Sequence, residues 1–97
     1  MNIHPALLPS FPGSHAHEDA LDYGVKVTGL TIHFVDETMD GGPVIFQHAV
    51  AVLDDDTPES LSGRVLAKEH QFYPVVIEDV VNGKYLRKGR KVIRLKD

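Results

Sequence analysis

The sequence predicts a single small α/β domain that covers residues 1–97. Two stretches rich in β-branched residues, 26–35 and 44–53, alternate apolar and polar residues as strands do. A longer stretch, 58–81, places apolar residues three to four positions apart, which is typical of an amphipathic helix. The length of 97 residues suits one domain and is too short for two. We therefore expect an antiparallel hairpin with a long helix packed against it.

The composition excludes several classes of protein. Hydrophobic residues make up 42% and charged residues 25% of the chain, as in an ordinary globular domain. The chain has no cysteine, so disulfides and thiolate metal sites are excluded. No apolar run approaches the roughly 18 residues that span a bilayer, and the N-terminus has no basic segment followed by an apolar one. We expect a cytoplasmic location and no membrane partner.

The first fifteen residues, MNIHPALLPSFPGSH, are predicted to form an irregular segment. Pro5, Pro9 and Pro12 are incompatible with a regular helix and with a central strand. A loop of this length in a small domain is uncommon and often functional. A short helix is expected next, at residues 17–23, because acidic residues stand near its start and a glycine ends it.

The two predicted strands read KVTGLTIHFV and VIFQHAVAVL. The segment between them reads DETMDGGP and is typical of a turn, since Gly41 and Gly42 have free backbone dihedrals and Pro43 fixes the exit. The strands are therefore predicted to pair antiparallel across a long connection.

The long helix is predicted to begin at Pro58, with Asp56 or Thr57 as its N-cap. Pro74 lies inside it and is expected to kink it. An Asn-Gly pair at residues 82–83 is expected to end it, and one or two short strands should follow within residues 84–95.

The last fourteen residues hold seven of the ten basic residues of the chain: Lys84, Arg87, Lys88, Arg90, Lys91, Arg94 and Lys96. Such a stretch could bind nucleic acid. Because Tyr85 is the only aromatic residue within it, it offers little surface on which bases could stack. Lysines on an edge strand also discourage edge-to-edge pairing. We favour a solvated edge hairpin and expect no nucleic-acid partner.

Three separate motifs are candidates for chemistry: NIHP at residues 2–5, His33, and DGGP at residues 40–43. An Asn can donate to a developing oxyanion, a His can carry a proton, and an Asp can orient that His and stabilise its charged form. Brought together, these residue types would support acyl chemistry. Their spacing alone does not show that they meet.

A metal site is the alternative interpretation of the same region. His15 and His17 are separated by one residue, and His33 could join them. No further ligand stands at a characteristic spacing, and nothing resembles the motifs of zinc enzymes. We therefore expect no metal.

Four motifs together resemble the glycinamide ribonucleotide formyltransferase family, within the folate-dependent formyltransferase superfamily. They are NIHPALLPSFPG at residues 2–13, G-x-T-x-H-F-V at 29–35, D-x-x-x-D-G-G-P at 36–43 and K-E-H-x-x-Y-P at 68–74. Formyltetrahydrofolate hydrolases and methionyl-tRNA formyltransferases share the Asn-x-His and the downstream Asp. Hydrolases usually have a second histidine where this chain has Pro5, and the tRNA enzymes usually lack His-Phe-Val, so both resemble the chain less closely.

The resemblance implies transfer of a formyl group from 10-formyltetrahydrofolate, as co-substrate, to the amine of glycinamide ribonucleotide in de novo purine biosynthesis. By similarity, Asn2 would donate to the tetrahedral oxyanion. His4 would stabilise that oxyanion and take part in proton transfer. Asp40 would pair with His4 and order a water that moves protons.

The resemblance also implies binding and supporting roles. A folate-binding loop would present backbone groups to the pterin from Asp36, Glu37, Thr38, Met39 and Asp40. Glu69 would contact the nucleotide substrate, and His33 would support the site. The alternatives are an ordinary strand histidine at residue 33, a solvated helix acid at residue 69, and a turn residue at position 40 that caps its own backbone.

Members of the family also contain an N-terminal half with parallel strands. The resemblance therefore implies that this chain is the C-terminal half of a mixed sheet and that a separate N-terminal half is its partner. A catalytically idle binding module is the alternative. We expect Asn2 and His4 to follow a buried strand, residues 1–15 to be displaced without that support, and exposed sheet surface to favour self-association.

Overall fold

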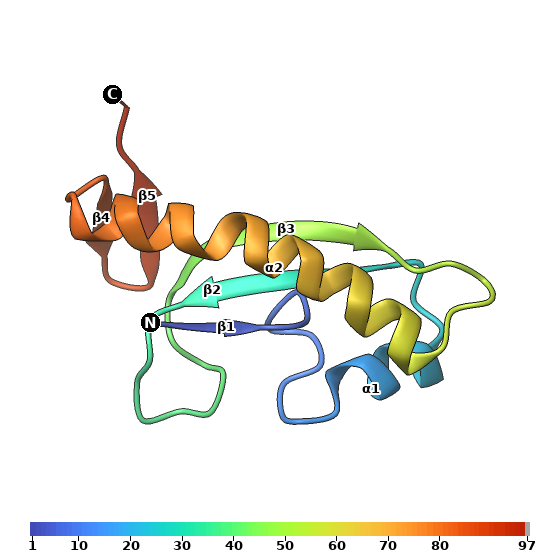
Figure 1. Ribbon diagram of the computed structural model, residues 1–97. Helices are drawn as coiled ribbons and strands as arrows, with labels where there is room; N and C mark the ends of the chain where they lie inside the picture. The colour runs from blue at the N-terminus through green and yellow to red at the C-terminus, as the bar shows by residue number, and fades with distance from the viewer. Residues whose placement is uncertain (97) are drawn as a thin grey trace.

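The computed structural model describes residues 1–96 and contains a three-stranded sheet, two helices and a separate hairpin (Figure 1). The sheet has the order β1-β2-β3, with β1 at Asn2–His4, β2 at Val27–His33 and β3 at Val44–Ala51. The helices are α1, Ala16–Tyr23, and α2, Pro58–Val81. The hairpin consists of β4, Tyr85–Lys88, and β5, Lys91–Arg94. The predicted α/β class and the predicted order of the larger elements are confirmed.

The central pairing of the sheet is the predicted antiparallel hairpin. Val27 of β2 lies opposite Ala51 of β3, and Ile32 lies opposite Phe46. The register shifts between Ile32 and His33, where β2 leads into the connection to β3. Such an irregularity turns the side chains at a strand end. Both strands are shorter than the predicted ranges because the turn at each end takes up residues of the alternating pattern.

The strand β1 was not predicted from the sequence pattern. Its three residues pair antiparallel with β2, from Asn2 opposite His33 to His4 opposite Thr31. Pro5 follows at once and has no N–H with which to extend the ladder. The prolines therefore exclude a longer strand, as expected, and leave room for a short one at the edge of the described sheet. Asn2 and His4 lie within β1 itself, and the expectation that they follow a buried strand in a complete enzyme stays a prediction.

The irregular segment between β1 and α1 is tied to the sheet by hydrogen bonds. The Thr31 hydroxyl donates to the carbonyl of Ala6 at 2.6 Å and accepts from the N–H of Leu8 at 3.0 Å. The Gln47 amide donates to the carbonyl of Leu8 at 2.8 Å. The expectation that this segment is displaced is therefore wrong, because β2 and β3 supply the support that it needs.

The long helix begins and ends where the sequence predicts. The Thr57 side chain accepts from the N–H of Ser60 while the Ser60 hydroxyl accepts from the N–H of Thr57, which forms a capping box. Pro58 occupies the first turn, and the helix continues through Pro74 to Val81.

The hydrophobic core lies between the sheet and α2. Leu30 and Ile32 of β2 are fully buried against a cluster that includes Leu61 and Val65 of α2. Figure 1 shows α2 crossing over the sheet, with α1 beneath its N-terminal end. Every residue of β2 after Val27 is buried, and β2 pairs with β1 on one side and β3 on the other, so it is the central strand of the sheet.

The C-terminal hairpin agrees with the prediction of one or two short strands after the long helix, since it contains β4 and β5. Tyr85 of β4 and Val92 of β5 pack against the hydrophobic core, while most of the other residues of the hairpin are exposed. Within residues 1–96, no helix combines the length and the hydropathy that a membrane span requires.

Candidate active site

Three of the predicted site residues meet beside the end of β1. The Nδ1 atom of His4 lies 3.5 Å from Oδ2 of Asp40, and Nε2 of His33 lies 3.9 Å from Oδ1 of the same carboxylate. The backbone N–H of Gly13 donates to Oδ2 of Asp40 at 2.8 Å. All three side chains are largely buried, with exposed fractions of 6%, 4% and 12% for His4, His33 and Asp40. We call these three residues the Asp40 cluster.

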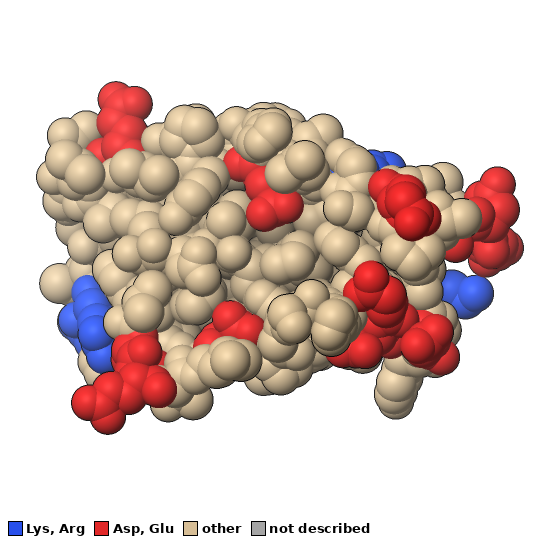
Figure 2. Space-filling model, turned by 60° about the horizontal axis from the view of Figure 1, so that its bottom comes forward, with Lys and Arg blue, Asp and Glu red and all other residues tan. Residues whose placement is uncertain are grey.

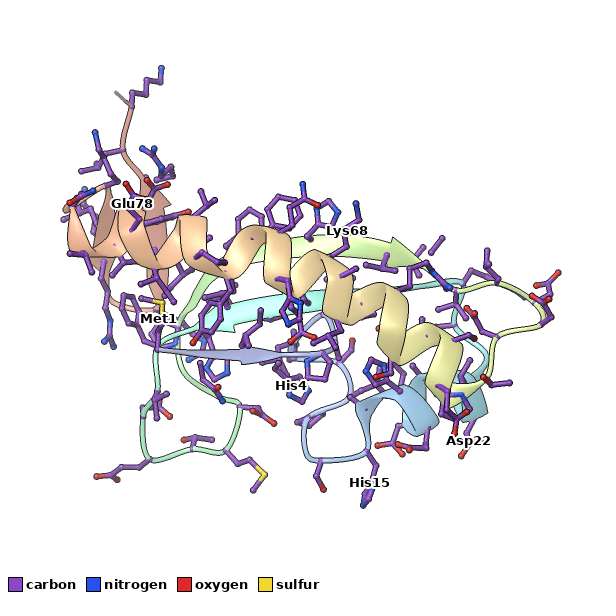
Figure 3. The ribbon with its side chains drawn as sticks, viewed as in Figure 1. Met1, His4, His15, Asp22, Lys68 and Glu78 are labelled. Atoms are coloured by element: carbon purple, nitrogen blue, oxygen red, sulfur yellow. The ribbon has the colours of Figure 1, made fainter. Side chains whose placement is uncertain are left out.

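His4 is held with one ring nitrogen toward the carboxylate. It is the last residue of β1, and Figure 3 places it at the end of that strand beneath α2. Its Nε2 atom lies 2.8 Å from the carbonyl oxygen of Phe11. A carbonyl oxygen can only accept, so Nε2 carries a hydrogen and donates to it. Nδ1 is thereby left facing Asp40, where it can pass a proton to the carboxylate or receive one.

His33 lies on the other side of Asp40 and is held in the same manner. Its Nδ1 atom lies 3.0 Å from the carbonyl oxygen of Phe34 and donates to it. Its Nε2 atom is buried, and among the described residues it has no hydrogen-bond partner. A buried unpaired nitrogen is costly in an ordinary core. This observation favours a supporting role in a site over a satisfied strand histidine, and the role itself stays a prediction.

Asp40 owes its position to the turn chemistry of the DGGP motif. Its backbone φ is +54°, in the left-handed region that Asp tolerates better than most residues. A Cβ at Gly42 would lie 1.7 Å from the carbonyl oxygen of Phe34, so only glycine fits there. In this loop Asp36, not Asp40, caps its own turn, by accepting from the N–H of Thr38 at 2.8 Å. The carboxylate of Asp40 reaches across to Gly13 instead, against the simple turn interpretation.

Asn2 shares a strand with His4 but not its surroundings. Residues two apart on a strand point to the same face, so the side chains of Asn2 and His4 project from the same side of β1. Asn2 is exposed, whereas His4 is buried. An exposed amide on the same face as the buried cluster is available to a bound molecule.

Glu69 lies on α2, in an open groove of about 460 Å³ that runs between β1 and this helix. Ile3, Leu66 and Tyr73 supply most of the apolar lining. Burial raises the pKa of Glu69, and the nearby charges of His70 and His4 oppose that rise. Glu69 is therefore half-buried and electrostatically coupled to His4, unlike a fully solvated helix acid.

The loop predicted to bind folate projects into solvent. Its residues Asp36, Glu37, Thr38 and Met39 are exposed, and Met39 keeps 78% of its surface accessible. Figure 2 views the molecule from below relative to Figure 1, and on that face acidic side chains outnumber basic ones. The loop thus offers exposed residues, among them the apolar Met39, next to Asp40.

His17 is a half-buried histidine that the sequence suggests only as a metal ligand. The Nδ1 atom of His17 is buried without a partner among the described residues. Burial lowers the pKa of His17, Glu18 raises it, and the charge of His4 lowers it further. His15, by contrast, is exposed and lies 3.9 Å from Glu18. Within residues 1–96, no three His, Asp or Glu side chains are arranged to hold a metal ion.

Comparison with known proteins matches most of this chain to one family. The model of the formyl transferase family covers residues 1–77, which leaves the β4–β5 hairpin outside the match. Over 83 residues the chain is 54% identical to the trifunctional purine biosynthetic protein adenosine-3 of Bos taurus, covering 86% of this chain and 8% of that protein. Over 81 residues it is 48% identical to the phosphoribosylglycinamide formyltransferase of Bacillus subtilis, covering 84% of this chain and 42% of that protein.

A solved structure shows the same fold. The glycinamide ribonucleotide transformylase 1 of Symbiobacterium toebii superposes with a TM-score of 0.95 at 50% sequence identity. The superposition covers 98% of this chain and 45% of that protein. The chain thus spans less than half the length of these relatives.

Proposed function

The chain belongs to the formyl transferase family, and from this membership we propose that it carries the catalytic residues of a phosphoribosylglycinamide formyltransferase. The proposed reaction moves a formyl group from 10-formyltetrahydrofolate to the primary amine of glycinamide ribonucleotide, in purine biosynthesis. The single observation that carries the proposal is the buried Asp40 cluster, in which a carboxylate faces two imidazoles without being saturated by hydrogen bonds.

The proposed chemistry follows from how these groups are held. The amine attacks the formyl carbon, and the carbonyl oxygen becomes an oxyanion. Asn2 donates an N–H to that oxyanion, and His4 stabilises it. Asp40, with or without an intervening water, accepts the proton that leaves the amine. The proton then passes to the folate nitrogen, the oxyanion returns to a carbonyl as the bond between the formyl carbon and that nitrogen breaks, and tetrahydrofolate leaves.

The binding roles are distributed over two elements. We assign the folate to the loop formed by Asp36, Glu37, Thr38, Met39 and Asp40, because its first four residues are exposed beside the cluster. We assign the nucleotide substrate to the groove of α2 that contains Glu69, because this half-buried carboxylate interacts electrostatically with His4. His33 lies on the far side of Asp40 in a supporting role. No step of this chemistry uses a metal.

The proposed enzyme includes a further half. The described sheet ends at β1, and the neighbouring groove of α2 is open and largely apolar. An additional strand along β1 would pair its free edge. We therefore expect an N-terminal half as the partner and expect the 97-residue chain alone to transfer little or no formyl group. Self-association through the same surface and a cytoplasmic location both stay predictions.

Reconstitution with a second half tests the proposal. The part of the Bacillus subtilis relative that this chain does not match would be co-expressed with it, and formylation of glycinamide ribonucleotide would be followed with 10-formyltetrahydrofolate. We expect formylation that is lost in Asp40→Asn and kept in Asp22→Asn, which removes an exposed carboxylate from α1.

Three results would argue against the proposal. A well-formed complex of the two halves that transfers no formyl group contradicts the catalytic assignment. Release of formate without formylated product would indicate a formyltetrahydrofolate hydrolase instead. Folate binding without any turnover would indicate an idle binding module.

A further inference from the structure

The loop between β2 and β3, residues 34–43, is closed at its base and exposed at its tip. The N–H of Phe34 donates to the carbonyl of Pro43 at 2.9 Å, while residues 35–39 are exposed. Asp40 follows the exposed stretch with its positive φ. Aspartate tolerates this conformation better than most residues do, and within the loop the N–H of Gly41 donates to the carbonyl of Thr38 at 3.2 Å. Contacts from outside the loop hold the same stretch of backbone as well.

Two contacts from distant parts of the chain meet the loop at this point. On one side, the N–H of Gly13 donates to the carboxylate of Asp40. On the other side, the Nη2 atom of Arg90 donates to the carbonyl of Gly41 at 2.6 Å. Arg90 lies in the turn between β4 and β5, and Figure 1 shows this turn beside the base of the loop. The peptide next to Asp40 is thus held by the C-terminal hairpin.

The hairpin holds the Arg90 backbone in a fixed place. Gly89 takes a φ of +60° in the turn, and Nε of Arg87 donates to its carbonyl at 3.0 Å. Tyr85 and Val92 anchor the two strands against the hydrophobic core. A guanidinium that projects from such a turn has a restricted range of positions.

Charge also favours this contact. The loop carries the acidic residues Asp36, Glu37 and Asp40, and the hairpin carries half of the basic residues of the chain. A hydrogen bond from a charged donor is stronger than one between neutral groups. The negative charges of the loop therefore attract the Arg90 guanidinium and strengthen its hydrogen bond to Gly41.

We propose that Arg90 is a positioning residue for Asp40, and this inference rests on the proposed role of Asp40 in formyl transfer. By holding the carbonyl of Gly41, Arg90 fixes the backbone of Asp40 and so the approach of its carboxylate to His4. Small misplacements of a catalytic group are costly to the rate. The basic hairpin is then a clamp on the site rather than only a solvated edge.

Nuclear magnetic resonance of the 97-residue chain tests the clamp directly. Arg90→Met keeps the apolar stem and removes the donors. We expect shifted amide resonances at Gly41 and Gly42, shifted imidazole signals of His4, and hydrogen exchange of the Gly13 N–H faster by about three- to tenfold, the loss expected for one hydrogen bond. Arg90→Lys, which keeps a charged donor, should restore most of these signals. Lys91→Ala, which removes a charge from the same hairpin, should leave them unchanged.

Unchanged loop signals in Arg90→Met, or equal effects of Lys91→Ala, would overturn the inference. If Arg90→Met disrupts the pairing of β4 with β5, Arg90→Lys decides the matter. With that pairing intact, exchange at Gly13 as slow as in wild type supports the clamp, and accelerated exchange in Arg90→Lys counts against it. These readouts report loop geometry whether or not formyl transfer occurs. In the reconstituted enzyme, Arg90→Met should lower kcat with little change in KM. A moved loop together with an inactive wild-type complex would refute the proposed function and leave the clamp standing.

Discussion

Two aspartates of this chain are both largely buried, but they are paired in opposite ways. Asp56, before α2, accepts from the N–H of Leu53 at 2.7 Å, from the Ser60 hydroxyl at 2.8 Å and from both terminal nitrogens of Arg64. These bonds hold the pKa of Asp56 well below its usual range, with the Arg64 hydrogen bond as the largest cause. Asp40 accepts one backbone N–H and faces two imidazoles at longer distances.

The difference in hydrogen bonding indicates that Asp56 stabilises the fold, whereas Asp40 is available for proton transfer. A saturated carboxylate is locked in its ionised form and cannot exchange protons near neutral pH. A carboxylate with unused acceptor capacity beside an imidazole can take part in proton transfer. Substitutions at the two positions should therefore have opposite consequences for stability and activity.

The largest expected effect is the loss of activity in Asp40→Asn. The amide keeps the shape of the side chain but cannot accept the proton of the attacking amine. We expect kcat of the reconstituted enzyme to fall by roughly 10²- to 10⁴-fold, as for loss of a general base. Thermal unfolding should change little, since Asp40 contributes few bonds to the fold. A large fall in Tm with activity retained would show instead that Asp40 stabilises the fold and is not needed for the reaction.

The next largest effect is expected from Gly42→Ala. A Cβ at this position would lie 1.7 Å from a backbone oxygen, so the base of the Asp40 loop must move. We expect a loss of about 1–3 kcal/mol in the free energy of unfolding, as for overpacking. Gly63→Ala is the matched control, because nothing lies within 4 Å of a Cβ there and helix propensity favours alanine. Urea denaturation of both variants measures the contrast, and equal effects would contradict it.

Asp56→Asn should lower Tm at neutral pH and leave the activity of the folded enzyme intact. Because the pKa of Asp56 is lowered on folding, its contribution to stability is fully present above the unfolded pKa of about 3.9 and is lost as pH falls below it. The difference in Tm between wild type and Asp56→Asn should therefore shrink from pH 5 toward lower pH. A difference that grows on acidification would rule out this assignment.

The smallest effect is expected from Glu69→Gln. Burial raises the pKa of Glu69, so its ionised form is disfavoured in the folded state and folding is penalised once pH exceeds the unfolded pKa of about 4.3. Glu69→Gln should raise Tm slightly at pH 7, and the gain should vanish near pH 4. In the reconstituted enzyme the same variant should raise KM for glycinamide ribonucleotide. A variant less stable than wild type at pH 7 would contradict the burial argument.

The larger elements were predictable because their patterns are local and long. The alternating pattern extends over the 7 residues of β2 and the 8 residues of β3. The three-to-four spacing extends along α2, which has 24 residues. The cap at Thr57 follows from residues that are adjacent in sequence. β1 has only three residues, too few for any periodicity, and it exists because β2 offers an edge.

The site was predictable only in part for the same reason. Residue types suggested acyl chemistry, but the resemblance to formyltransferases, not spacing, brought Asp40 and His4 together. The exposed surroundings of Asn2 and the unpaired nitrogen of His17 depend on how loops fold over the sheet. The hydrogen bond from Arg90 to Gly41 joins residues 49 positions apart, so no short sequence motif could predict it.

The antiparallel pairing of β1 with β2 also bears on the order of folding. The hairpin of β2 and β3 closes a connection of only ten residues, 34–43, whereas His4 must find Thr31 across the whole of α1 and its flanking loops. Longer loops cost more entropy to close, and non-local contacts form more slowly. We expect β2, β3 and α2 to assemble first and β1 to dock last. The geometry that joins His4 to Asp40 would then be the last to form during refolding and the first to be lost during partial opening.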